Sequence, residues 1–271
     1  MIDLSKIVLR KLLARLAFLA IGLLLIYYYV NHLFISQLSN PALVYPDLDN
    51  TYWLFLFLAI PQQIAGSISL SFLLDGSLVV FLVLSFVFWK KPIFPICFLL
   101  LYVLYFITYN SFSCHHFHHT GVFFLVLPFC FSGSAFSLIF EFIRYYLCFI
   151  YASAGCYKLF RGTIFNTNQL VEVLRTTHLE ALSNNELNPF LDFLLSTPFF
   201  SHSLFVFAVL LELFFIVGFF TKKLDYLLFI ALIVMKVSLF LVMDFVAWEL
   251  LLLDIIMIPS INKRLYKNQV D

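Results

Sequence analysis

The chain has 271 residues, of which 63% are hydrophobic and only 11% charged, with a formal net charge of +1 and a mean hydropathy of +1.01. Soluble domains carry about 25% charged residues, so the composition excludes an ordinary soluble protein and indicates an all-α, polytopic membrane helical bundle. The basic residues mostly flank apolar runs, which excludes a nucleic-acid-binding surface. We interpret residues 1–271 as a single integral membrane domain in the lipid bilayer.

The apolar runs predict about eight transmembrane helices, because a bilayer core of about 30 Å takes about 20 helical residues. They lie near residues 16–36, 69–89, 92–110, 119–133, 136–160, 200–221, 224–242 and 244–260. The run at 119–133 is the weakest, since Pro128 and the sequence SGS (132–134) interrupt it. Residues 51–61 are too few to cross and are expected at the interface or as a re-entrant segment.

Basic residues predict the orientation of these helices. With the N-terminus in the cytoplasm, the pairs Lys90–Lys91 and Lys222–Lys223 and the basic residues of 263–267 all fall inside. Both termini are then cytoplasmic, as expected for a multi-pass protein of the cell (inner) membrane. The basic N-terminus leads into an apolar run without an A-x-A-type cleavage site, so no cleaved signal peptide is expected.

Two parts of the chain share a pattern that favours an internal repeat of two four-helix halves. LDGSLVVFLVLSFVFWKKPIFPICFLLLYVLYF and LELFFIVGFFTKKLDYLLFIALIVMKVSLF each have an acidic residue early in one helix, a Lys-Lys turn and a second long helix. Arg15 opens the first predicted helix as Arg144 opens the fifth. Such halves would have the same topology and an axis along the membrane normal. Phe- and Leu-rich sequence also mimics repeats, so a chance similarity is the alternative.

The segment 161–199 is the longest predicted loop and is expected on the outer surface. Its apolar residues recur at helical spacing between residues 170 and 182. This spacing predicts one or two amphipathic helices that lie on the outer leaflet over the mouth of the bundle.

The sequence SCHHFHHTG (113–121) holds four histidines at the predicted outer rim. His115, His118 and His119 share one helical face, whereas His116 does not. They could bind a metal ion, contact a substrate or transfer a proton, or form a solvated helix end. A histidine cluster without cysteine or carboxylate ligands at fixed spacing is a weak metal signal, so no metal is predicted. The five cysteines show no paired metal-ligand spacing either.

Ionisable residues inside a bilayer cost about 3 kcal/mol each, so those within the predicted helices are expected to face the interior. Glu141 and Arg144 are three residues apart, and we expect them to pair locally. Lys236 lies deep in the seventh predicted helix and needs a carboxylate, which Glu249 or Glu212 would supply. A structural ion pair, a proton relay and a substrate site are the three interpretations of this buried charge network. Asp254 is expected to be protonated or hydrogen-bonded.

Lys158 ends the fifth predicted helix, at the same rim as the histidines. The preceding residues YASAG (151–155) are small, which permits another helix or a ligand to approach the backbone closely. Apolar surroundings disfavour a charged amine, which suits a general base, whereas an interfacial lysine that extends to the headgroups is the alternative.

The segment YASAGCYKLF (151–160) resembles a helix of the vitamin K-dependent gamma-glutamyl carboxylases and their bacterial "horizontally transferred transmembrane" (HTTM) relatives, roughly Y-F-x-A-G-x-x-K-L. The family's lysine deprotonates vitamin K hydroquinone, so the resemblance implies Lys158 as the catalytic base. FHHTG (117–121) is similar to a helix start where an Asn-His pair assists, which implies His118 or His119 as catalytic partners. His115, Tyr157 and Asp244 are the expected substrate contacts.

Two departures from the carboxylases limit this resemblance. Where they carry a second His-Asn pair, VMKVSLF (234–240) holds Lys236 and no histidine. No segment of these 271 residues is expected to form the large lumenal domain that binds the protein substrate of the carboxylases. The resemblance therefore implies quinone-linked chemistry at the outer rim, with a quinone as the cofactor or substrate, and not glutamyl carboxylation.

YASAGCYKLF with LELFFIVGFFTKK (211–223) also resembles the four-helix DoxX/MauE membrane proteins, often accessory subunits of redox or cysteine-maturation pathways. Three functions thus remain: an enzyme-like site for a quinone-like or other lipid-soluble small molecule, an accessory subunit with a membrane-protein partner, and a small-solute transporter. The enzyme predicts that Lys158 and a histidine converge, and the transporter predicts a polar cavity near Lys236.

Overall fold

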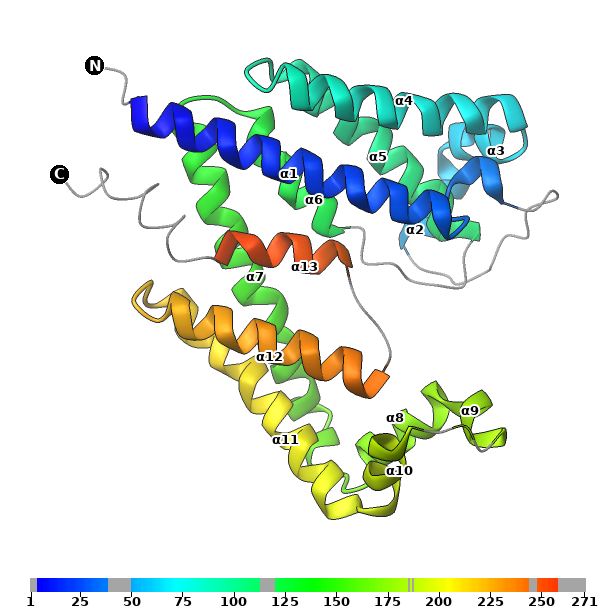
Figure 1. Ribbon diagram of the computed structural model, residues 1–271, viewed down its shortest axis with the longest axis vertical. Coiled ribbons are helices and arrows are strands. Elements are labelled where there is room, and N and C mark those ends of the chain that lie inside the picture. The colour runs from blue at the N-terminus through cyan, green and yellow to red at the C-terminus, as the bar shows by residue number, and fades with distance from the viewer. Residues whose placement is uncertain are drawn as a thin grey trace. The chain divides into compact units, whose positions relative to one another are not determined.

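The computed structural model describes residues 4–38, 50–112, 120–184, 186, 188–243 and 248–257, and all regular structure in these ranges is helical (Figure 1). The expected all-α membrane fold is confirmed. Six elements are long and apolar enough to cross a bilayer. They are α1 (Leu4–Val30), α4 (Ile68–Val87), α5 (Ile93–Phe112), α7 (Ser134–Phe160), α11 (Pro198–Phe214) with the 3-10 helix η4 (Phe215–Phe219), and α12 (Asp225–Met243).

These six helices match six of the eight predicted crossings, and they carry many exposed large apolar side chains. Such surfaces are stable against lipid and unstable against water. The chain is therefore a multi-pass membrane protein.

The other two predicted crossings contain short helices in the described part of the chain. Residues 119–133 include α6 (Thr120–Val126) and the 3-10 helix η2 (Leu127–Cys130), in which Pro128 is the second residue. Residues 244–260 include α13 (Trp248–Asp254) and the 3-10 helix η5 (Ile255–Met257), whose flanks lie outside the described residues. A count of eight crossings stays a prediction.

Two segments form short helices beside the long ones. The first contains the 3-10 helix η1 (Ile35–Gln37), α2 (Asn50–Phe57) and α3 (Ala59–Ala65). The second contains the 3-10 helix η3 (Thr163–Phe165), α8 (Gln169–Thr177), α9 (Leu179–Ser183) and α10 (Pro189–Ser196). On α8, Val171 and Leu174 are buried while Glu172 and Arg175 are exposed, so this helix is amphipathic. The location of the segment on the outer leaflet stays a prediction. Leu174 packs with Leu191 and Leu194 of α10.

The helices group into two compact units, residues 1–140 with 247–253 (unit 1) and residues 141–246 with 254–271 (unit 2). In unit 1, α4 packs against both α1 and α5. In unit 2, α11 packs against α12 and α8. The expectation of one integral membrane domain stays a prediction, because compactness alone does not show whether a unit folds by itself.

The chain runs through the same order of elements twice. Each pass has a 27-residue helix (α1, α7), a 3-10 turn, short helices, two long helices with a Lys-Lys turn between them, and a short helix that ends as a 3-10 helix. The start of α7 comes 130 positions after the start of α1, and the start of α11 comes 130 positions after that of α4.

The same shift of 130 positions relates individual backbone features. His32 and Gly162 both have positive φ, 56° and 69°, directly after the two 27-residue helices. The N–H of His32 donates to the carbonyl of Tyr29 at 3.3 Å, and that of Gly162 to the carbonyl of Leu159 at 3.0 Å. Glycine adopts this left-handed conformation easily, whereas histidine is strained in it.

A buried serine repeats with the same shift. The hydroxyl of Ser71 donates to the carbonyl of Ile64 at 2.8 Å, and the hydroxyl of Ser201 to the carbonyl of Leu194 at 2.6 Å. In both places the bond joins a long helix to the short helix before it. Matching bonds at a constant shift are stronger evidence for an internal repeat than a shared excess of Phe and Leu.

We predict that Ser71→Ala and Ser201→Ala each lower the free energy of unfolding by about 1 kcal/mol, because each removes one buried hydrogen bond between helices. Ser203→Ala is the control, since its exposed hydroxyl bonds only to the carbonyl of Phe199 within its own helix. Thermal unfolding of the purified variants in one detergent measures the effect. Equal losses for Ser201→Ala and Ser203→Ala would contradict the assignment.

Candidate functional site

Three polar side chains lie along one face of α7, at Arg144, Tyr151 and Lys158. Their spacing of seven residues is close to two helical turns, so they form a stripe with a rise of about 10 Å per step. Each side chain meets a carboxylate of unit 2.

The first position is a buried ion pair. Arg144 is 0% exposed, and its guanidinium donates to Asp225 through Nε (3.0 and 3.2 Å to the two oxygens) and through a terminal nitrogen (2.5 Å). It also donates to the carbonyls of Gly218 at 3.0 Å and Thr221 at 3.2 Å. Two nitrogens of the planar guanidinium donate to one carboxylate, and these hydrogen bonds compensate for the free energy that both charged groups lose when they leave water.

The expected local pair of Arg144 with Glu141 is wrong. Glu141 accepts a hydrogen bond from Lys222, in a more exposed pair, while Arg144 reaches Asp225, 81 positions later. A guanidinium buried in the bilayer needs several acceptors at once, and a neighbour on its own helix supplies too few.

The second position joins Tyr151 of α7, Asp254 of α13 and Lys236 of α12. The Tyr151 hydroxyl donates to Asp254 Oδ1 at 3.3 Å, and Lys236 Nζ lies 3.8 Å from Asp254 Oδ2. The Lys236 ammonium also lies 5.8 Å from the centre of the Tyr151 ring, within reach of a cation–π interaction.

Among the described side chains, the carboxylate near Lys236 is Asp254. The predicted partner Glu212 pairs with Lys158 instead. A pair with Glu249 stays a prediction, because that side chain lies outside the described residues. The expected hydrogen bond to Asp254 is confirmed, with Tyr151 as its donor.

The third position is the pair of Lys158 and Glu212, whose Nζ and Oε1 are 2.5 Å apart. The Lys158 side chain is 33% exposed, so one side of the pair is open. The second Glu212 oxygen, Oε2, is buried and has no hydrogen-bond partner in the part of the chain that the structure describes.

Gly155, one turn before Lys158, permits this pair to form. A Cβ at Gly155 would lie 3.0 Å from Glu212 Cβ and 3.0 Å from the backbone nitrogen of Leu213. The close approach expected from the small residues of YASAG is therefore confirmed, and it brings Glu212 of α11 to the face of α7.

The remaining predicted site residues are not brought to this pair by the described structure. His115, His118, His119 and Asp244 lie outside the described residues, so the convergence of Lys158 with a histidine stays a prediction. Tyr157 is exposed, and its ring lies 5.0 Å below the Arg161 guanidinium. Among the described residues, no group of three His, Cys, Asp or Glu is arranged to bind a metal ion.

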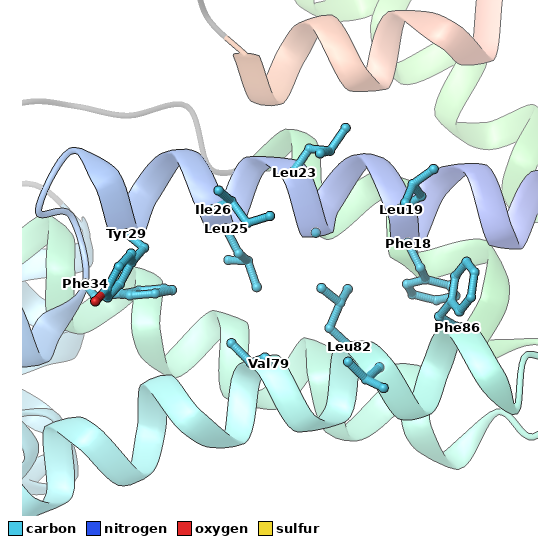
Figure 2. Close-up of a pocket in the computed structure, with 12 residues that line it drawn as sticks. Phe18, Leu19, Leu23, Leu25, Ile26, Tyr29, Phe34, Val79, Leu82 and Phe86 are labelled. Carbon is cyan, nitrogen blue, oxygen red and sulfur yellow. The ribbon is translucent and has the colours of Figure 1, made fainter.

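Unit 1 has a different feature, an apolar groove of about 480 Å³ between α1 and α4 (Figure 2). Phe18 and Phe86 lie at one end of it, and Tyr29 and Phe34 lie at the other. No charged side chain lines the groove. Leu82, in the groove wall, is 130 positions before Glu212, so the two units carry different chemistry at this position.

Sequence reasoning missed Tyr151 as a member of the stripe and Asp225 as the partner of Arg144. The seven-residue spacing of Arg144, Tyr151 and Lys158 is a readable signal for a shared helical face. Asp225 had no such signal, because its partner lies on a helix far away in the sequence.

No protein-family model, no curated protein and no solved structure matches this chain. The class of protein therefore follows from the fold and composition alone. It is an all-α, multi-pass membrane protein, and its second unit contains two buried ion pairs and the partly open pair of Lys158 and Glu212.

We predict that Gly155→Ala lowers the free energy of unfolding by about 1–3 kcal/mol, because the new methyl group must push α11 away from α7. Gly22→Ala is the matched control in α1, where a Cβ would meet Leu82 at an ordinary 3.6 Å. There the better helix propensity of alanine stabilises by up to about 1 kcal/mol. Thermal unfolding of both variants decides the matter, and a neutral Gly155→Ala would contradict the close helix contact.

Proposed function

We propose that this protein binds a quinone-like, lipid-soluble molecule at the Lys158–Glu212 pair. The observation that carries the proposal is an ion pair with one open side, in a helix end surrounded by apolar groups. Ion pairs inside a bilayer are costly, and those that remain reachable usually serve a ligand or a proton.

The pair offers complementary groups to such a molecule. Lys158 Nζ has N–H donors beyond the one that Glu212 Oε1 accepts, and these suit a quinone carbonyl. Glu212 Oε2 has a free lone pair that suits the hydroxyl of the reduced, quinol form. A proton that leaves a quinol hydroxyl would pass to this pair, so Lys158 and Glu212 together would fill the role of the catalytic base.

The surroundings favour a ligand that arrives through the bilayer. Tyr157, Leu159 and Phe160 are all exposed around Lys158 at the end of α7. Aromatic side chains at a helix end are typical of the membrane interface. We place this end on the outer side, since Lys90–Lys91 and Lys222–Lys223 lie in turns at the opposite, cytoplasmic side of the predicted topology.

We also keep the HTTM/carboxylase-like relationship as a proposal, with His118 or His119 as the partner of Lys158 and His115, Tyr157 and Asp244 as substrate contacts. The support for it is the sequence YASAGCYKLF and the carboxylate that Lys158 meets. The DoxX/MauE-like accessory subunit is the alternative for the same residues.

We predict that the wild-type protein in lipid nanodiscs binds decylubiquinone, and that Lys158→Met and Glu212→Gln each raise the Kd about tenfold, as expected for a lost hydrogen bond to a charged group. Titration with the quinone, followed by quenching of tryptophan fluorescence, measures the Kd. Lys222→Met is the matched control, because it removes an ion pair of unit 2 that lies elsewhere, and its Kd should be unchanged.

Two results of this titration would contradict the proposal. One is an absence of saturable binding by the wild-type protein, which would favour the accessory-subunit alternative. The other is an equal loss in all three variants, which would indicate a general effect on unit 2. His118→Ala tests the histidine role, and a Kd that stays at the wild-type value would remove His118 from the site.

A further inference from the structure

We propose that Asp254 is a proton-binding site within the membrane. The site consists of Asp254, Tyr151 and Lys236, and the inference does not depend on the ligand of the Lys158–Glu212 pair.

The first argument is a contrast between two equally buried carboxylates. Asp225 and Asp254 are 3% and 4% exposed. Asp225 accepts three hydrogen bonds of 2.5, 3.0 and 3.2 Å from Arg144, whereas Asp254 accepts a single bond of 3.3 Å from Tyr151 and has Lys236 at 3.8 Å. Asp254 Oδ2 is buried and has no hydrogen-bond partner among the described residues.

A buried carboxylate oxygen without a hydrogen bond is costly as an anion, so a proton on that oxygen relieves the cost. The Lys236 ammonium, 3.8 Å from Asp254 Oδ2, is too far away to donate such a bond. Asp254 therefore has one oxygen that Tyr151 holds and one that is able to take up a proton.

The second argument is that the fold does not need these groups. At the corresponding positions of the repeat, unit 1 has Ile21 in place of Tyr151 and Val126 in place of Asp254, shifted by 130 and 128 positions. Both are buried, as are their counterparts in unit 2. The same order of helices thus forms with apolar side chains at these two positions, and apolar side chains cost less free energy to bury in a bilayer. A structural role alone therefore does not explain Tyr151 and Asp254.

The third argument is that the stripe on α7 is open at one end and closed at the other. Lys158 is half-exposed two turns beyond Tyr151, whereas Arg144, two turns before it, is fully buried and saturated with acceptors. We therefore expect a proton to reach Asp254 from the side of Lys158.

The test is the reaction of Asp254 with dicyclohexylcarbodiimide, an apolar reagent. It adds to a protonated carboxyl, whose proton moves to a carbodiimide nitrogen while the carboxyl oxygen bonds to the central carbon. The purified full chain in nanodiscs is treated at neutral pH, and peptide mass spectrometry gives the labelling rate at each residue. Asp225 is the internal comparator, since its exposure matches that of Asp254.

We expect Asp254 to react at least about tenfold faster than Asp225, because both Asp225 oxygens accept hydrogen bonds from Arg144 whereas Asp254 Oδ2 accepts none. Tyr151→Phe removes only the hydroxyl that stabilises the Asp254 anion, so the labelling of Asp254 should rise several-fold while Asp225 stays unlabelled. Lys236→Met should have the same effect, because it removes the neighbouring cation.

Labelling of Asp254 no faster than that of Asp225, or no change in Tyr151→Phe, would overturn the proposal. A variant that unfolds is recognised by the loss of its helical circular dichroism signal. The quinone titration is separate from this assay, so either proposal can fail while the other stands.

Discussion

The burial of Arg144 is the constraint on which the second unit depends. A guanidinium inside a bilayer is tolerated only where its donors are satisfied, and Asp225, Gly218 and Thr221 supply the acceptors. These three residues lie on η4, the Lys-Lys turn and the start of α12. Arg144 of α7 therefore holds the end of η4, which continues α11, next to the start of α12. Gly218 makes room, since a Cβ there would lie 2.5 Å from Cys148 Sγ.

The two units have the same order of helices but differ in the side chains on one face of their first long helix. Unit 1 has Ala14, Ile21 and Tyr28 where unit 2 has Arg144, Tyr151 and Lys158. Its helices α1 and α4 leave an apolar groove, whereas Gly155 lets α7 and α11 approach until Lys158 reaches Glu212. At these three positions of the first long helix, unit 2 thus carries polar groups that meet carboxylates, while unit 1 carries side chains that cost less to bury in a bilayer.

The sequence was informative where a local pattern decides the structure. Helix length and hydropathy predicted eight crossings, six of which match the long apolar helices. The spacing of Val171 and Leu174 predicted the amphipathic helix α8. It failed where partners come from distant segments. The local rule paired Arg144 with Glu141, and the partner is Asp225, because burial demands more acceptors than one helix face can offer. The internal repeat became clear only through backbone details such as the bonds of Ser71 and Ser201.

The central claim is that the buried Arg144–Asp225 pair holds unit 2 together, and a double-mutant cycle tests it most directly. Unfolding free energies would be measured in one detergent for wild type, Arg144→Met, Asp225→Leu and the double variant. The account predicts that each single variant loses about 3–5 kcal/mol, and that the double variant recovers most of this loss, because no charge is left unpaired. Losses that simply add, or an Arg144→Met variant as stable as wild type, would contradict it.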